Sequence, residues 1–352
     1  MSSHRASVRV FGATLSALAA LILAACGSDD AEEDGGSGGS DAADTDGGPG
    51  SGGGGSTAEE HRVGNFDVEL NAANPTTGAS AYTSVFGVVR DGAANEAIVW
   101  DVAQSLDGCD LLTPRAPFCD PQCDVSSTCV EDGVCLPNPT AHSVGTVTFI
   151  GLESEAGGPI TLSPMTGSNT YMPSGAVAVS YPPAAEGAVI QVSTEGGDYA
   201  PFTVTGTGIS PLTMLNQLNA DQKVDMPPDQ DLALQWTPPG ASSDTHVEIE
   251  IDISHHGGAQ GLVRCLVDDT GSFSIPQPLV SGLIELGVAG FPTVMIIRRS
   301  RGSVDIEPGR VDLDVFATVV LDLNIPGYIS CNDNADCVAV GLTTCQNDRT
   351  CI

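Results

Sequence analysis

The clearest pattern along the chain is an alternation in which every second residue from Val311 to Ile325 is apolar. Successive side chains of an extended strand point to opposite faces, so this spacing places the apolar residues on one face. The segment HVEIEIDIS repeats the pattern, with apolar residues 247, 249, 251 and 253 alternating with Glu248, Glu250 and Asp252. Both segments therefore predict half-buried antiparallel strands.

Shorter runs rich in Val, Ile and Thr recur between turns that draw on 42 glycines and 23 prolines. The run at 279–286 is the one fair helix candidate. We therefore predict an all-β protein built as an antiparallel β-sandwich. Further strands are expected at 84–89, 97–102, 145–152, 176–181, 188–193, 231–236, 261–267 and 293–298.

Two β-rich regions follow from the spacing of these runs, at 61–218 and at 219–330. The second, with Trp236 on an early strand, resembles an immunoglobulin or fibronectin type III sandwich. That likeness concerns architecture and implies no function. The sequence leaves open whether the first region is a separate sandwich or part of one larger body.

The amino-terminal segment has the layout of a signal peptide. Arg5 and Arg9 precede an apolar run from Phe11 to Leu23, which is too short to cross a bilayer of about 30 Å as a helix. The segment ends Leu23-Ala24-Ala25-Cys26 and resembles the bacterial lipobox. By that resemblance residues 1–25 are removed, and Cys26 carries a diacylglyceryl thioether and an amino terminus acylated by a fatty acid such as palmitate.

The residue after Cys26 is Gly27. It is not the aspartate that this class of lipoprotein uses for retention in the inner membrane, so the resemblance implies anchoring in the outer membrane. Residues 27–60 carry ten carboxylates and no basic residue. Such a segment buries too little apolar surface to offset the entropy of ordering, so 26–60 is predicted to be a disordered acidic tether of about 32 Å r.m.s. span.

The whole chain has a formal net charge of −33, and loss of Arg5 and Arg9 would take it to −35. Phosphate contacts require clustered Lys and Arg, so we expect no nucleic-acid partner. The one local cluster of basic residues consists of Arg298, Arg299 and Arg301. Two interpretations stay open: capture of an anionic partner, or pairing with carboxylates on neighbouring strands, which we favour.

Eleven cysteines cannot all pair with one another, and assigning Cys26 to lipid leaves ten. Export delivers such a chain to an oxidising compartment, so disulfides are expected. Two local groups share the phrase T-C-x-x-D-x-x-C, one in the cysteine-rich insertion at 109–135 and one in a knuckle at 331–352. The groups are Cys119, Cys123, Cys129 and Cys135, and Cys331, Cys337, Cys345 and Cys351.

Cys109 and Cys265 remain, and we predict that they pair with each other across the body. Within each group three connectivities are possible, and the sequence does not choose among them. Zinc is the rival interpretation, but neither group has the C-x-x-C spacing or the histidines typical of a structural zinc site. We therefore predict no metal and no cofactor.

One constellation offers acid–base chemistry: Glu248, Glu250 and Asp252 on one strand face, followed by His255 and His256. It supports an alternative function as a periplasmic or surface hydrolase. We favour a solvated strand face and a polar loop, because no nearby residue orients a base. No G-x-S-x-G elbow or dinucleotide fingerprint occurs at a predicted strand-to-helix turn, and no H-E-x-x-H or phosphate-loop motif is present in the sequence.

The order of lipobox, acidic tether, β-rich body and terminal cysteine knuckle resembles surface lipoproteins of the myxobacterial type. That resemblance implies a noncatalytic protein anchored in the outer membrane by lipid, which displays its body to an envelope or glycan partner. Aromatic platforms for a glycan are sparse. Trp100 and Trp236 are expected in the core, whereas Tyr171, Tyr181 and Tyr199 adjoin Pro or Gly in loops that could display them.

Overall fold

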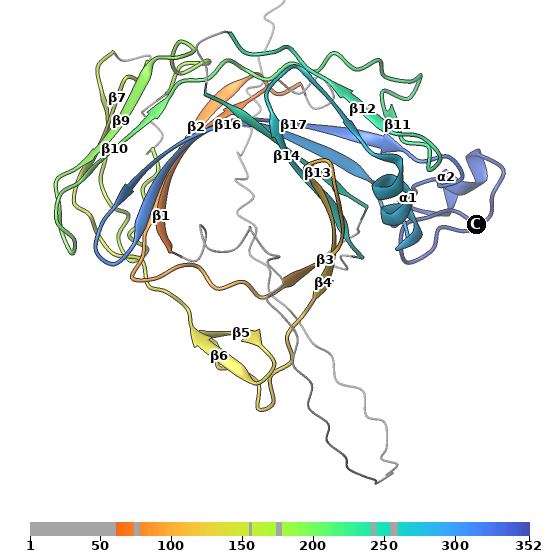
Figure 1. Cartoon of the computed structure of the whole chain (residues 1–352), viewed down its shortest axis with the longest axis horizontal. Helices are drawn as coiled ribbons and strands as arrows, with labels where there is room; N and C mark the ends of the chain where they lie inside the picture. The colour runs from red at the N-terminus through yellow and green to blue at the C-terminus, as the bar shows by residue number, and fades with distance from the viewer. Residues whose placement is uncertain (1–60, 74–77, 155–156, 174–177, 241–243, 254–259) are drawn as a thin grey trace, which may run out of the picture. The chain divides into compact units, whose positions relative to one another are not determined.

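The computed structural model describes residues 61–73, 78–154, 157–173, 178–240, 244–253 and 260–352 (Figure 1). These residues form many strands and two short helices, and the prediction of an all-β fold with disulfide knuckles is confirmed. The described residues belong to one compact unit.

Most strands join a nine-stranded sheet that curves strongly (Figure 1). Its order is β2-β1-β17-β16-β13-β14-β4-β3, and β11 pairs with the far end of β17. The strands are β1 (Arg62–Asn71), β2 (Tyr82–Val89), β3 (Val99–Leu106), β4 (Cys109–Arg115), β11 (Val224–Asp225), β13 (His246–Asp252), β14 (Leu262–Asp268), β16 (Thr293–Asp305) and β17 (Arg310–Asn324).

Smaller sheets complete the β structure. A four-stranded sheet has the order β10-β9-β7-β8, and two two-stranded antiparallel sheets are formed by β12 with β15 and by β5 with β6. Their strands are β5 (Ser127–Glu131), β6 (Val134–Pro137), β7 (Val147–Ile150), β8 (Ile160–Leu162), β9 (Val189–Thr194), β10 (Thr203–Thr207), β12 (Leu232–Gln235) and β15 (Ser272–Ile275).

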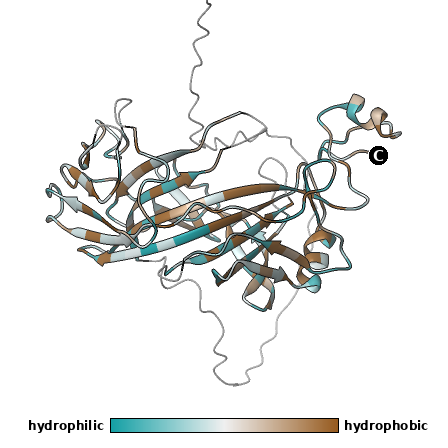
Figure 2. Ribbon diagram, turned by 90° about the horizontal axis from the view of Figure 1, so that it is seen from above, coloured by the Kyte–Doolittle hydropathy of each residue, from teal (hydrophilic) through white to brown (hydrophobic). Residues whose placement is uncertain are grey.

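Most of the pairing follows from the alternation seen in the sequence. The odd-numbered apolar residues of β17 from Val311 to Ala317 are buried, and the same spacing recurs in β13. Figure 2 shows hydrophobic (brown) and hydrophilic (teal) positions interspersed along the strands. All strand pairs among the described residues are antiparallel except two, β1·β17 and β11·β17. The parallel pair β1·β17 places Phe66 beside Leu313 and Val68 beside Val315. It joins the first described strand to the last.

The four-stranded sheet packs face to face on the nine-stranded sheet, which is the sandwich arrangement. Phe66 of β1 and Phe149 of β7 meet edge to face, with ring centroids 6.0 Å apart. The closest approach lies where β10 crosses β16, because any Cβ at Gly302 would overlap the carbonyl oxygen of Thr205. Only glycine fits at that crossing.

The predicted helix is present as α1 (Gln277–Glu285), which begins after Pro276 with Pro278 in its first turn. Proline is tolerated there because the first amides of a helix have no intrahelical acceptor. Its buried residues Leu279, Val280, Leu283 and Ile284 recur at helical spacing and face strands β4 and β14. A second helix, α2 (Asn334–Ala339), lies in the terminal knuckle and was not predicted.

The expected division at residue 218 needs correction. β1 and β4 come from the first predicted region, yet β1 pairs with β17 and β4 pairs with β14 from the second. Residues 219–330 therefore do not form a self-contained immunoglobulin-like sandwich, because their strands need β1 to β4 to complete the sheet. The question left open by the sequence is answered in favour of one larger body.

A buried ion pair anchors the loops that cover the apolar face of the sheet. Arg298 of β16 is fully buried, and its Nε donates to Asp269 Oδ2 at 2.6 Å. The same guanidinium donates to the carbonyl oxygens of Ser210, Pro211 and Thr237. Asp269 also accepts hydrogen bonds from Trp236 Nε1 and Thr245 Oγ1. Each charged group in this cluster therefore has an oppositely charged partner and further hydrogen bonds, as a buried charge requires.

Replacing Arg298 with methionine should therefore lower the free energy of unfolding by about 3–5 kcal/mol, because Asp269 is left charged and buried. Arg115→Met is the matched control. Arg115 pairs with Asp101, but about half of each side chain is exposed (49% and 54%), so its loss should cost no more than about 1 kcal/mol. Urea denaturation followed by circular dichroism measures both. Equal losses in the two variants would contradict this assignment.

Candidate functional site

All ten cysteines between Cys109 and Cys351 form disulfides, with the grouping that the sequence predicts. Cys109 bonds to Cys265 across the neighbouring strands β4 and β14, where the two residues are direct cross-strand partners. Both are buried. This bridge spans 156 residues of sequence and joins the two predicted β-rich regions.

The two knuckles have the same connectivity, first cysteine to third and second to fourth. The bonds are Cys119–Cys129, Cys123–Cys135, Cys331–Cys345 and Cys337–Cys351. The shared phrase T-C-x-x-D-x-x-C also has the same backbone shape in both, since Gly133 and Arg349 at its equivalent position have φ of 75° and 64°. The sequence repeat is thus a structural repeat.

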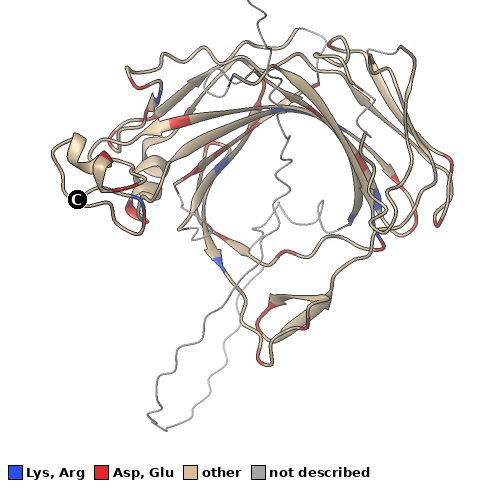
Figure 3. Cartoon of the chain, turned by 180° about the vertical axis from the view of Figure 1, so that it is seen from behind, with Lys and Arg blue, Asp and Glu red and all other residues tan. Residues whose placement is uncertain are grey.

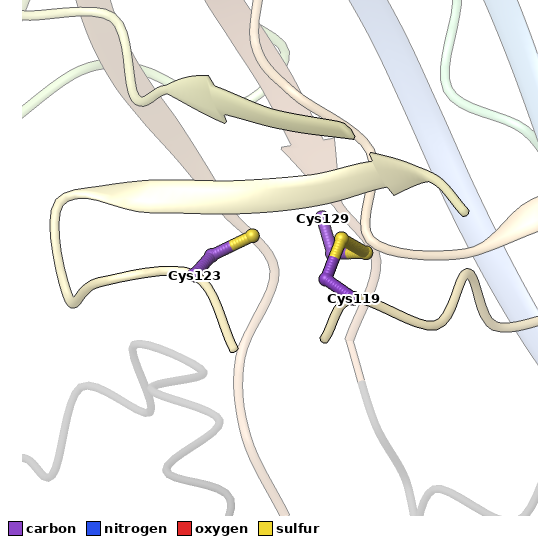
Figure 4. A group of neighbouring side chains, drawn as sticks. All are labelled: Cys119, Cys123 and Cys129. Carbon is purple, nitrogen blue, oxygen red and sulfur yellow. A yellow bond between two sulfur atoms is a disulfide. The ribbon is translucent and has the colours of Figure 1, made fainter. Parts of the chain in front are cut away.

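Three of the four sulfur atoms in each knuckle lie together, and Figure 4 shows those of the first knuckle. In the first knuckle the sulfurs of Cys119, Cys123 and Cys129 all lie within 4.8 Å of one another, and those of Cys331, Cys337 and Cys351 do so in the second. Thiolate, not disulfide, is the form of cysteine that binds metal ions. The knuckles in their oxidised form are therefore structural crosslinks.

The carboxylate constellation on β13 is only partly as predicted. Glu248 and Glu250 lie on the polar face of the strand, opposite its buried residues, but each is held by an arginine. Arg299 donates to both oxygens of Glu248 at 2.9 and 3.1 Å. Arg264 of β14 donates twice to Glu250 Oε2 at 3.2 and 3.0 Å. His255 and His256, which the hydrolase alternative requires beside these carboxylates, lie outside the described residues.

The electrostatics of Glu248 oppose a role as a general acid. Burial raises its pKa, but a hydrogen bond with His246 and the charge and hydrogen bonds of Arg299 outweigh that effect and lower the pKa to about 2. His246 Nε2 lies 3.3 Å from Glu248 Oε1. A carboxylate held ionised in this way has no proton to donate near neutral pH.

The arginine cluster behaves as a set of partners for carboxylates, and the favoured interpretation of Arg298, Arg299 and Arg301 is confirmed. Arg299 also lies 3.3 Å from Asp314, and Arg301 donates to Asp314 at 2.7 Å. Arg310 donates to Asp312 at 2.8 Å. The pairs of Arg299 and Arg301 with Asp314 cross from β16 to β17, whereas Arg310 and Asp312 both lie on β17. Figure 3 shows blue and red positions on this curved sheet.

Asp312 and Asp314 are buried, and sequence reasoning missed them. Nearby Asp67 of β1 is the direct partner of Asp314 in the parallel pair. Burial raises the pKa of Asp67; a hydrogen bond from Asn65 lowers it, and the charge of Asp314 raises it again. The sequence did contain a signal for these two aspartates. The segments RRSRG and RVDLD lie on either side of the short turn 306–309, and a hairpin at that turn places Arg301 opposite Asp314.

The division of the aromatic residues between the core and the exposed loops differs from the prediction. Trp236 is fully buried, as predicted, but Trp100 on edge strand β3 is only half-buried. Tyr171 was expected in a display loop and is instead in the core, where its hydroxyl accepts a hydrogen bond from the amide of Val144 at 2.8 Å. Tyr181 and Tyr199 are partly buried against the core. No described tyrosine of this set forms an open platform.

Cys26, its lipobox and the acidic tether lie outside the described residues. No helix in the described part of the chain is long and apolar enough to span a bilayer. No protein-family model and no curated protein sequence matches the chain.

The knuckle connectivity predicts a specific peptide map under non-reducing conditions. A protease that cleaves before aspartate separates the four cysteines of the first knuckle, because Asp120, Asp124 and Asp132 lie between them. Mass spectrometry should find the Cys119 peptide linked to the Cys129 peptide, and the Cys123 peptide linked to the Cys135 peptide. A Cys119–Cys123 or Cys119–Cys135 link would contradict the structure.

The lowered pKa of Glu248 predicts a stability difference that depends on pH. Its folded pKa of about 2 lies below the ordinary value of 4.5, so its ion pairs stabilise the protein above about pH 5 and this stabilisation is lost as pH falls toward about pH 2. The gap in unfolding free energy between wild type and Glu248→Gln should narrow over that range by about 1–2 kcal/mol, after allowance for solvent screening. A gap that stays constant in urea denaturation across this pH range would refute the assignment.

Proposed function

We propose that this protein is a noncatalytic lipoprotein, anchored through Cys26 in the outer membrane, that displays its β-sheet body to an envelope or glycan partner. The observation that carries the proposal is the parity of the cysteines. Ten of the eleven cysteines are used in disulfides. The one left over is Cys26, which directly follows Leu23-Ala24-Ala25 at the end of an apolar run.

The disulfides also support maturation outside the cytoplasm. Five disulfides in one chain are typical of exported proteins, since cytosolic thiols are kept reduced. Two or more acyl chains on one cysteine give firm membrane attachment, because each buried CH₂ contributes about 0.8 kcal/mol and a single chain holds only marginally. A tether of 34 residues then separates the body from the bilayer.

A noncatalytic role is supported by the way the ionisable groups of the sheet are used. Arginines from neighbouring strands bind Glu248, Glu250 and Asp314, and Arg310 of the same strand binds Asp312. An acid–base catalyst needs a group with a pKa near the working pH and room to approach a substrate. These carboxylates instead stabilise the sheet, which suits a body whose task is to present a surface.

The test is metabolic labelling with an alkyne-bearing palmitate in a bacterium with a lipoprotein pathway. Wild type should be labelled and should fractionate with the outer membrane, whereas Cys26→Ser should be unlabelled and released. The matched control is the double variant Cys119→Ser/Cys129→Ser, which removes one disulfide and keeps Cys26, so its labelling should equal that of wild type. Unlabelled wild type, or equal label on Cys26→Ser, would overturn the lipid anchor.

A further inference from the structure

The polar face of the nine-stranded sheet carries a patch of mixed character at its centre. In Figure 1 the sheet curves like a trough with the four-stranded sheet and α1 outside the curve, so its polar face lines the inside. Two rows of cross-strand neighbours from β17, β16, β13 and β14 lie on this face. The rows are Val320, Met295, Glu250 and Arg264, and Thr318, Ile297, Glu248 and Leu266. These eight residues form the central patch.

The central patch exposes apolar side chains among charged ones. Leu266 is 62% exposed and Val320 is 55% exposed, although both belong to strands in the interior of the sheet. The side chain of Arg264 is 52% exposed, and Met295 and Ile297 are half-buried. Apolar side chains that stay exposed within a rim of polar residues mark interaction sites on protein surfaces. The central patch is therefore a candidate binding surface.

The charges of the central patch are balanced by arginines. Arg299 binds Glu248 and Arg264 binds Glu250, with nitrogen–oxygen distances of 2.9 and 3.0 Å. An anion would have to displace a carboxylate from its arginine, and a cation would have to displace an arginine from its carboxylate. Each exchange leaves a charged group without its partner, which costs free energy. The patch therefore favours a ligand without charge.

Glu250 keeps one carboxylate oxygen for a ligand. Both hydrogen bonds from Arg264 go to Glu250 Oε2, so Oε1 accepts none from the described part of the chain. Nη1 of Arg264 donates none within the same residues. A hollow of about 30 Å³ lies beside these side chains, which is enough for one hydroxyl-sized group. The hollow is lined by Glu248, Ile249, Glu250, Arg264, Met295 and Ile297.

The position of the patch argues against an extended peptide as the ligand. A peptide that pairs with a β-sheet adds its strand at an edge, where backbone groups are free. β13 and β16 are each paired on both sides, so the patch offers side chains and not backbone groups. Uncharged sugars match this surface, because their hydroxyl groups both donate and accept hydrogen bonds while their C–H groups pack on apolar side chains.

We propose that the central patch binds an uncharged glycan. Hydroxyl groups of a sugar unit donate to Glu250 Oε1 and accept from Arg264 Nη1, and its C–H groups pack on Met295 and Val320. Aliphatic side chains thus take the place of aromatic platforms. The ion pair holds Glu250 and Arg264 in position before the ligand arrives, which reduces the entropy lost on binding. The proposal rests on the display function proposed above, and it names the site and the chemical class of the partner.

The experiment uses the full chain carrying Cys26→Ser, so its outcome does not depend on lipid. A glycan array presents neutral oligosaccharides of glucose, galactose, mannose and N-acetylglucosamine beside oligosaccharides that contain uronic acids. Titration calorimetry then measures the affinity for the neutral glycan with the strongest signal. Binding should be confined to neutral glycans. If no neutral glycan binds, or if acidic glycans bind equally well, the proposal is overturned, whereas the lipid anchor is tested separately by the palmitate labelling.

Two variants of the central patch locate the site. Glu250→Ala removes the free acceptor and Leu266→Asp places a charge on the apolar surface, and each should weaken binding about tenfold or more. One matched control is Asp101→Ala, which breaks the exposed ion pair with Arg115, and the other is Val189→Asp, which adds a charge at a 68% exposed position of β9. Both controls should bind like wild type, and circular dichroism checks the fold of all four variants. Unchanged affinity in both patch variants, or an equal loss in the controls, would overturn the proposal.

Discussion

The parallel pairing of β1 with β17 is the constraint on which the rest of the structure depends. It runs over nine register pairs from Arg62 to Asn71, and it joins strands that lie nearly the whole body apart in sequence. Among the described strands, β2 pairs with β1 alone, and the face of β1 that carries Phe66 supports the second sheet. The far side of the sheet is closed in a similar way, by the Cys109–Cys265 bridge between β4 and β14.

A strongly acidic chain places its few basic residues where they organise the fold. Arg298 holds three loop segments on the buried face, while Arg299, Arg301 and Arg310 bind carboxylates on the opposite face of the same two strands. Buried charges of this kind contribute less to net stability than apolar residues would, but they penalise any register that leaves them unpaired. In this sheet they select one alignment of β16 against β17.

The sequence predicted those features that depend on local spacing. Alternation identified β13 and β17, helical spacing identified α1, and the repeated cysteine phrase identified both knuckles. It could not predict the partner of β1, because pairing between strands so far apart leaves no local trace. For the same reason it divided the body at residue 218, and it placed Tyr171 in a loop although the fold buries that side chain.

The candidate site shows the same limit. The alternation placed Glu248 and Glu250 on one face of the strand. Only the register of the neighbouring strands shows that Arg299 and Arg264 form ion pairs with them. Likewise, the cysteine spacing identified the two knuckles, but only the fold shows that the first cysteine of each bonds to the third and the second to the fourth. Interactions between residues that are distant in sequence could be identified only from the three-dimensional structure.

The most direct test of this account is hydrogen exchange measured by mass spectrometry in increasing denaturant. If β1 and β17 close one cooperative sheet, the amides of residues 62–71 and 310–324 become exchangeable with the same free energy of opening. Exchange of β1 at a clearly lower denaturant concentration, while β13, β16 and β17 stay protected, would show that the strands after residue 218 fold without it. That result would contradict the single-body architecture.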